Sequence, residues 1–165
     1  MAPPIETVAL ADDELLITRT FDAPVSLVFR LWEVREHMMR WLGPAAFTCA
    51  HLDMDFRPGG AWRACIQSEA YGGSWMGGVY REIERDRRIV YTFAWEDGRD
   101  QPGVATLITV TFAERDGKTI QSFHQAPFLH VEARDSHVDG WNQSLDKLQT
   151  LAESLAGRET REAAR

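Results

Sequence analysis

An apolar repeat in the last third of the chain predicts one long helix, from Val131 to Leu155. The apolar residues of this stretch follow one another at alternating intervals of three and four, which places them on one helix face. At 1.5 Å per residue, such a helix is roughly 35–40 Å long. The apolar face consists of Val138, Trp141, Leu145, Leu148, Ala152 and Leu155. A helix of this length can cross a whole sheet, so it constrains what the rest of the chain can form.

Turn-rich breaks divide most of the remaining chain into short apolar runs that predict strands. Pro58-Gly59-Gly60 and Asp116-Gly117 are two of these breaks. Connections this short, with no helical segment between the runs, require antiparallel pairing. The predicted strands are Glu14–Phe21, Phe47–Phe56, Ala61–Ser68, Trp75–Ile83, Arg88–Trp95, Val104–Ala113 and Lys118–Gln125.

Two short helices are predicted between the first and second strands. Asp22-Ala23-Pro24 is a helix start, with a capping carboxylate before a proline, and an apolar stripe follows from Val25 to Trp32. A second helix covers about Val34 to Leu42, where Gly43-Pro44 ends it. The order of elements therefore predicts an α+β fold.

A sheet of about seven strands is expected to curl around the C-terminal helix. Strand twist curves such a sheet, and a curved sheet meets a straight helix poorly along its length. We therefore expect an apolar, ligand-sized space between sheet and helix. The expected organisation is a loose lead-in over 1–13, one domain over 14–156 and a frayed polar tail over 157–165.

Composition argues against several classes of function. The chain has 165 residues, which suits one domain, and its net charge of −7 disfavours binding to nucleic acids or to anionic membranes. No apolar run approaches the roughly 18 residues of a membrane helix. The first residues lack the pattern of a signal peptide, so we expect a cytoplasmic protein whose Cys49 and Cys65 are reduced. Six Trp and eight Phe favour a pocket as well as a core.

Several short motifs follow one another along the chain in a characteristic order. They are Phe21-Asp22-Ala23-Pro24, Arg40-Trp41-Leu42-Gly43-Pro44, Asp55-Phe56-Arg57-Pro58-Gly59-Gly60, Gly78-Val79-Tyr80-Arg81-Glu82-Ile83, Ile89-Val90-Tyr91-Thr92, and Gly140-Trp141 followed by Leu145 and Leu148. In this order the chain resembles the Bet v 1-like/START-like (SRPBCC) superfamily, and within it the activator of Hsp90 ATPase homologues, over about residues 14–155. The resemblance implies a helix-grip fold with an internal cavity. It implies little about chemistry, since the superfamily includes carriers, hormone receptors, cyclases and co-chaperone domains.

Two segments contain catalytic residue types without a catalytic arrangement. Gly72-Gly73-Ser74-Trp75-Met76 fails as a nucleophile elbow, because its last position is not glycine and a strand follows it. Asp135-Ser136-His137 lies on the predicted helix, where neighbouring side chains point about 100° apart and cannot form a relay. We therefore assign no catalytic residue and no cofactor.

Two further motifs are interpreted as structural. Asp55 and Arg57 precede Pro58-Gly59-Gly60 on one side of a strand, which predicts a hairpin with a paired carboxylate and guanidinium. Cys49, His51 and Asp53 alternate along one strand and are expected on one face. Three such residues could bind a metal, but no second ligand cluster accompanies them, so no metal site is assigned.

The candidate ligand-binding residues are aromatic or polar side chains expected near the space. They are Trp41, His51, Trp62, Tyr80, Phe93, Trp95, Gln121, Phe123, Gln125, His137 and Trp141. Gly140, beside the last of them, costs about 1 kcal/mol within a helix, which favours close approach to the sheet or room for a ligand. The inward face of the last strand stays open, because Ile120 argues against the face of Gln121 and Gln125.

The sequence favours a binding protein for a small apolar or aromatic molecule over two alternatives. One is a cyclase- or hydrolase-like enzyme using the same cavity, with His51, His137 or a cavity carboxylate as the base. The other is a protein-interaction module related to Hsp90 ATPase activators, although an Hsp90-type chaperone is not the expected partner because no further domain is present to clamp it. A homodimer is compatible with the sequence.

Overall fold

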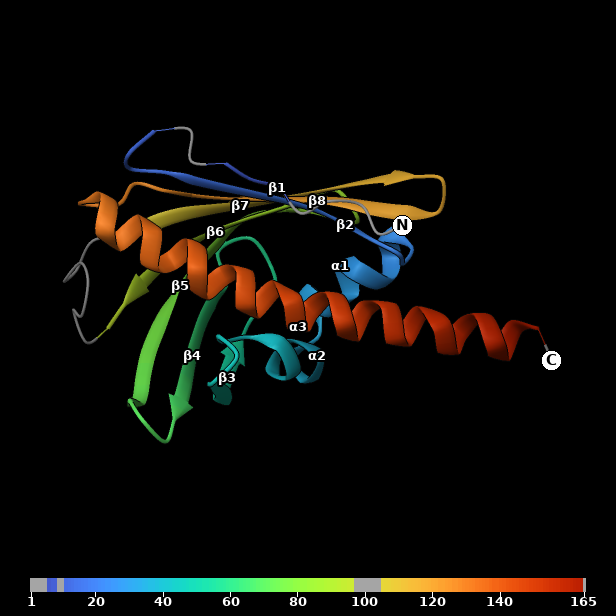
Figure 1. Ribbon diagram of the computed structural model, residues 1–165, viewed down its shortest axis with the longest axis horizontal. Helices are drawn as coiled ribbons and strands as arrows, with labels where there is room; N and C mark the ends of the chain where they lie inside the picture. Colours follow the sequence, from blue (N-terminus) through green and yellow to red (C-terminus); the bar gives the residue numbers. More distant parts are fainter. Residues whose placement is uncertain (1–5, 9–10, 97–104, 165) are drawn as a thin grey trace.

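A strongly bent antiparallel sheet lies along one side of a long C-terminal helix (Figure 1). This computed structural model describes residues 6–8, 11–96 and 105–164. The elements are β1 (Glu6–Val8), β2 (Leu15–Phe21), α1 (Val25–Glu33), α2 (Arg35–Trp41), β3 (Thr48–Met54), β4 (Ala61–Ser68), β5 (Gly72–Glu84), β6 (Arg88–Trp95), β7 (Thr106–Arg115), β8 (Lys118–Ala126) and α3 (Val131–Ala163). The predicted α+β helix-grip fold is confirmed.

The sheet has the order β1-β2-β8-β7-β6-β5-β4-β3, and every neighbouring pair is antiparallel. All seven predicted strands are present, although the predicted start of β7 at Val104 lies outside the described residues. Short β1, which falls in the predicted lead-in, adds an edge strand beside β2. In Figure 1 strands β4 and β5 run steeply away from the direction of β2 and β8, which is the curl that the strand number predicted.

Alternating burial identifies the inner face of the sheet, which α3 covers. In β2 the side chains of Leu15, Ile17, Arg19 and Phe21 are buried and those between them are half-buried. In β8 the buried set consists of Thr119, Gln121, Phe123 and Gln125. The face that the sequence left open is therefore the one that carries the two glutamines, and Ile120 faces outward.

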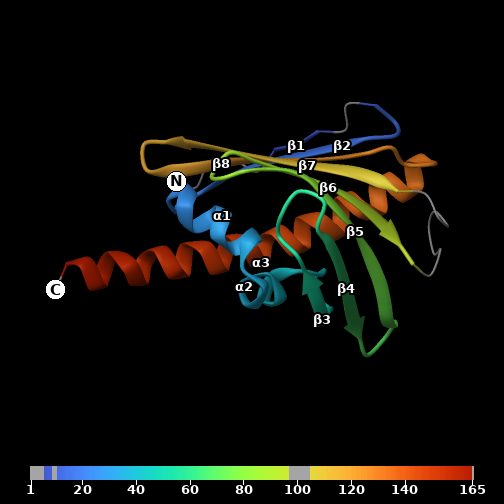
Figure 2. The ribbon, with the colours of Figure 1, turned by 180° about the vertical axis from the view of Figure 1, so that it is seen from behind.

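Helix α3 extends beyond the Leu155 at which the apolar pattern ends, because the segment predicted to be a frayed tail is helical as far as Ala163. This extension is rich in Arg, Glu and Ala, which are good helix formers. Glu159 in it pairs with Arg30 of α1, with 3.4 Å between the charged atoms. Figure 2 shows that the extension projects past the end of the sheet, so its polar residues stay exposed.

The start of α1 also differs from its prediction. Pro24 is the N-cap residue, and no side chain caps the helix, so Asp22 does not act as the predicted cap. The backbone N–H of Asp22 instead donates to Glu153 Oε2 of α3 at 2.9 Å. The segment before α1 is thus fastened to the long helix.

Candidate functional site

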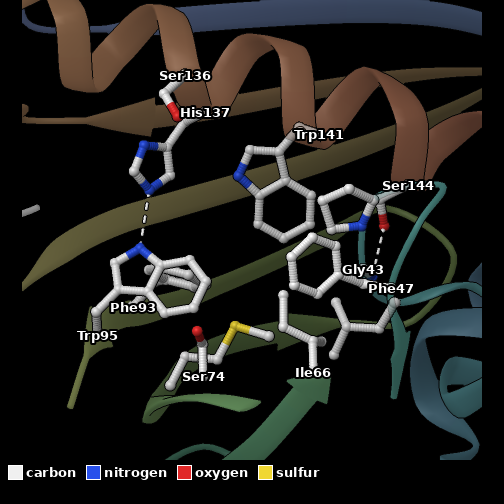
Figure 3. Close-up of a pocket in the computed structure, with 14 residues that line it drawn as sticks. Gly43, Phe47, Ile66, Ser74, Phe93, Trp95, Ser136, His137, Trp141 and Ser144 are labelled. Carbon is white, nitrogen blue, oxygen red and sulfur yellow. Dashed lines mark hydrogen bonds between the residues drawn. The ribbon is translucent and has the colours of Figure 1, made fainter. Parts of the chain in front are cut away.

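A cavity of about 230 Å³ lies between the N-terminal half of α3 and strands β4 to β6 (Figure 3). The α2–β3 connection closes one side of it. Most of its lining is apolar. The lining residues are Leu42, Gly43, Pro44, Phe47, Ile66, Ser74, Met76, Phe93, Trp95, Ser136, His137, Gly140, Trp141 and Ser144.

One face of α3 supplies the helical wall of the cavity. His137, Gly140, Trp141 and Ser144 lie at helix positions i, i+3, i+4 and i+7 and therefore point the same way. A Cβ atom added to Gly140 would meet Pro44 Cγ at 3.6 Å, which is an ordinary van der Waals contact. The backbone at Gly140 therefore has room for a side chain, and its absence leaves space in the cavity.

Trp95 and His137 are joined across the cavity wall. The indole Nε1 of Trp95 donates to His137 Nε2 at 3.0 Å, and His137 Nδ1 lies 2.7 Å from the carbonyl oxygen of Ala133. Because an indole N–H can only donate, Nε2 must be the acceptor. Nδ1 then donates to Ala133, so both ring nitrogens of His137 are engaged in hydrogen bonds.

A chain of hydrogen bonds fixes the ring of Trp141. Its Nε1 donates to Gln125 Oε1 at 2.8 Å, and Gln125 Nε2 donates to Thr106 Oγ1 at 2.9 Å. The Thr106 hydroxyl donates in turn to the carbonyl oxygen of Phe93 at 3.0 Å. The centroid of the Trp141 ring system also lies 4.5 Å from that of Phe123. These contacts connect the helical wall directly to β8, β7 and β6.

A second chamber, of only about 20 Å³, lies on the other side of Trp141 and Leu42. It has room for about one water molecule. The described residues around it are mainly aromatic: besides Trp141 they include Trp32, Trp41, Phe56, Trp62, Tyr80 and Tyr91. Burial raises the pKa of the Tyr80 and Tyr91 phenols well above the ordinary phenol value. The Trp141 indole thus separates the main cavity from the aromatic core.

The rim of the cavity is tied to α3 by polar contacts. The backbone N–H of Gly43 donates to Ser144 Oγ at 3.2 Å, and that hydroxyl donates to the carbonyl of Trp41 at 2.9 Å. Lys147 Nζ donates to the carbonyls of Pro44 and Phe47 at 3.3 and 3.1 Å. Burial lowers the pKa of Lys147, and its ammonium contacts the backbone of the rim. The α2–β3 connection is therefore held in place by the helix.

Ser74 of β5 places a free hydroxyl in the cavity. Its side chain is 2% exposed, and its Oγ has no hydrogen-bond partner in the described part of the chain. In Figure 3 this oxygen points toward the space below Trp95 and His137. Ser74 is the buried lining residue whose polar atom is available to a bound molecule.

The structure distributes ten of the eleven candidate residues over three regions, and His51 lies apart from them. Four line the main cavity, namely Phe93, Trp95, His137 and Trp141. Trp41, Trp62 and Tyr80 line the inner chamber, again with Trp141. Gln121, Phe123 and Gln125 lie behind the cavity wall and line neither space; Gln121 Oε1 accepts from Trp32 Nε1 at 2.9 Å. These three support the wall, and their role in binding stays a prediction.

His51 lies away from both spaces. A bulge interrupts the pairing of β3 with β4 between Cys49 and His51, so Cys49 is buried while His51 and Asp53 face outward. The expectation that the three residues share one face is therefore wrong, because an inserted residue shifts the alternation. His51 Nε2 lies 2.8 Å from Asp53 Oδ2, on the outer face of the sheet.

Ser74 and Met76 were missed as lining residues, although the sequence held a signal for them. Side chains along a strand share a face at every second position. Ser74, Met76, Gly78 and Tyr80 are separated by two residues each. Since Tyr80 was a candidate lining residue, Ser74 and Met76 could have been predicted on the same face of the strand. The structure places Ser74, Met76 and Tyr80 on the buried face. Phe47 and Pro44 lie in a connection, where no such rule applies.

The predicted hairpin after β3 is confirmed. Arg57 Nε donates to Asp55 Oδ2 at 2.7 Å, and β3 and β4 are paired on either side of the turn.

Across residues 6–8, 11–96 and 105–164, no group of three or more His, Cys, Asp or Glu side chains is arranged to hold a metal ion. Within the same residues, no helix combines the length and apolar character needed to cross a membrane.

Comparison with known proteins places this architecture in a family. Residues 22–153 match the family described as Activator of Hsp90 ATPase homolog 1-like protein. No curated protein matches the chain. Because the family match extends over most of the domain, it agrees with the resemblance seen in the sequence motifs.

Solved structures share the fold over nearly their whole length. A Chromobacterium violaceum protein is 29% identical, with 87% of this chain and 99% of that chain covered and a TM-score of 0.77. The AHSA1 protein of Silicibacter pomeroyi is 22% identical, with coverage of 88% and 99% and a TM-score of 0.75. An Arthrobacter aurescens protein is 16% identical, covers 93% of both chains and has a TM-score of 0.78. With its cavity between sheet and helix, the chain belongs to the activator of Hsp90 ATPase homologue 1-like family.

Proposed function

We propose that this protein binds a small apolar or aromatic molecule in the cavity between α3 and the sheet. The observation that carries the proposal is the cavity of about 230 Å³ with its mostly apolar wall. An apolar cavity of about 150 Å³ accepts benzene, so this one suits a substituted or fused ring. The rings of Phe93, Trp95 and Trp141 offer flat apolar surface to such a ligand.

Gly140 supports the interpretation of this space as a binding site. A glycine within a helix costs about 1 kcal/mol relative to alanine. At Gly140 an alanine Cβ would make an ordinary contact, so tight packing does not require the glycine. A residue that lowers helix stability while widening the cavity is expected where the space itself has a use.

The geometry favours binding over catalysis by a cavity base. His137 uses Nε2 to accept from Trp95 and Nδ1 to donate to Ala133. A general base needs a free nitrogen within reach of the proton that it removes. His137 would have to break the contact with Trp95 to supply one, so we assign it to the wall of the site.

The test is ligand capture followed by cavity filling. Protein purified from its own host is analysed by native mass spectrometry, and lipids and aromatic metabolites are then screened by thermal shift. Gly140→Leu places a side chain in the cavity and is expected to abolish binding. Gly157→Leu is the matched control, because it changes a glycine of the same helix away from the cavity.

The proposal fails if no molecule copurifies and no compound shifts the melting temperature of the wild type. It also fails if Gly140→Leu and Gly157→Leu bind a captured compound equally well. Far-UV circular dichroism of both variants establishes that they are folded before binding is measured.

A further inference from the structure

We propose that the cavity selects an uncharged ring compound with one hydrogen-bonding substituent, and that Ser74 is the residue that recognises this substituent. This inference rests on the ligand-binding function proposed above. It adds the chemical class of the ligand and a residue that determines specificity.

The first argument is the contrast between two buried serines in the cavity wall. Ser144 Oγ accepts from the backbone N–H of Gly43 and donates to the carbonyl of Trp41. Ser74 is equally buried, at 2% exposed, yet its Oγ has no partner among the described residues. Buried hydroxyls in folded proteins are nearly always paired. A polar atom supplied from within the cavity would complete the hydrogen bonding of Ser74.

The second argument is the position of Ser74 relative to the aromatic wall. In Figure 3 the Ser74 hydroxyl points up into the space, while Trp95 and Trp141 border the same space from above. Phe93 and Met76 continue the apolar lining beside it. A ring can therefore contact the aromatic side chains while a substituent on its edge reaches Ser74 Oγ.

The third argument is the absence of charge in the described wall. Among the lining residues that the structure describes there is no Lys, Arg, Asp or Glu. The ring nitrogens of His137 are already engaged with Trp95 and Ala133. A carboxylate or an ammonium entering the cavity would lose its water without gaining a counter-charge. A serine hydroxyl both donates and accepts, so phenols, alcohols and ketones suit it.

Three probes of one ring size test the inference: naphthalene, 2-naphthol and 2-naphthoate. Dissociation constants are measured by titration calorimetry for the wild type and for Ser74→Ala. The wild type is expected to bind 2-naphthol about fivefold more tightly than naphthalene, which is the effect of one neutral hydrogen bond. Ser74→Ala is expected to remove this difference and to leave the affinity for naphthalene within about twofold. The carboxylate is expected to bind at least about tenfold more weakly than 2-naphthol.

Ser154→Ala, on the exposed face of α3, is the matched control and is expected to bind all three probes as the wild type does. The inference is overturned if 2-naphthol keeps its advantage over naphthalene in Ser74→Ala, or if 2-naphthoate binds as tightly as 2-naphthol. In both cases the binding function itself survives. If the wild type binds none of the three probes, both proposals fail for ligands of this size. Ser74→Cys, which keeps the shape with a weaker donor, replaces Ser74→Ala if the latter does not fold.

Discussion

Replacing Gln125 with methionine is expected to loosen the wall of the cavity by breaking the chain of hydrogen bonds that holds Trp141. Gln125 is fully buried between Trp141 Nε1, which donates to its carbonyl, and Thr106 Oγ1, which accepts from its amide. Methionine has a similar length and can make neither bond. The variant therefore tests the polar contacts with little change in volume.

The expected loss follows from what each partner retains. The Trp141 indole N–H, on a side chain that is 7% exposed, loses its acceptor, and an unpaired buried donor costs about 1–3 kcal/mol. The Thr106 hydroxyl keeps the carbonyl of Phe93 as its acceptor and loses a single bond, worth about 1 kcal/mol. The unpaired Trp141 N–H and the lost bond to Thr106 together predict that the free energy of unfolding falls by about 2–4 kcal/mol. For a chain of this size, this corresponds to a decrease of about 4–16 °C in melting temperature.

A double-mutant cycle isolates the interaction. Trp141→Phe alone leaves the Gln125 carbonyl without its donor, whereas Gln125→Met with Trp141→Phe leaves neither group unpaired. We expect a coupling of about 1–2 kcal/mol in urea denaturation followed by circular dichroism. Ser122→Ala, on the outer face of the same strand, is the control and is expected to cost about 0.5 kcal/mol.

The reasoning would be refuted by a loss below about 1 kcal/mol in Gln125→Met together with additive effects in the cycle. That result would mean that water in the cavity serves the Trp141 N–H as well as Gln125 does. It would turn the chain of hydrogen bonds from a support of the wall into a replaceable contact.

Two further perturbations test other parts of the structure. Because burial raises the pKa of Tyr80 and Tyr91, folding stability is full below the ordinary phenol pKa of 10.0 and falls as the pH rises above it. In Tyr71→Phe, which retains just these two phenols, absorbance at 295 nm should rise only together with unfolding; a rise in folded protein would contradict their burial. Gly60→Ala should lower the free energy of unfolding by about 2–4 kcal/mol, since the alanine Cβ would lie 1.9 Å from the Asp55 carbonyl oxygen. Alanine at the preceding glycine, where the backbone has space, should cost only about 1 kcal/mol, and equal losses in urea denaturation would contradict the close approach.

The element order could be predicted from the sequence because each element carries its own periodicity. The stripe from Val138 to Leu155 and the alternation in β7 depend on local burial alone. Strand β8 lacks this clarity, because its inner face carries Thr119, Gln121 and Gln125 while Ile120 faces outward. In β8 the apolar Ile120 therefore predicts the wrong inner face. The correct face follows only from the hydrogen-bond partners that the two glutamines find in the core.

The cavity wall could be predicted in part, for a similar reason. Aromatic side chains such as Phe93 and Trp141 are recognisable candidates from residue type. The bulge that separates Cys49 from His51 leaves no mark in the residue pattern, because any residue can occupy the inserted position. A serine is likewise not recognisable as a cavity residue from its type. Ser74 stands out because its buried hydroxyl has no hydrogen-bond partner among the described residues, which only the three-dimensional structure reveals.

The cavity forms beside the N-terminal half of α3 because polar contacts hold the later part of the helix against the rest of the fold. Sheet curl predicts a gap but does not place it. Arg19 is almost completely buried under the helix, donates to the carbonyl of Asn142 at 2.9 Å and pairs with Asp146 at 2.8 Å. The contact of Asp22 with Glu153 fastens α3 two residues before its apolar stripe ends at Leu155. A buried guanidinium is destabilising without such partners, so these contacts hold the helix from residue 142 onward against β2 and α1. The sheet bends away at β4 to β6, and the preceding turns of α3 therefore bridge the space that Trp141 and Ser74 line.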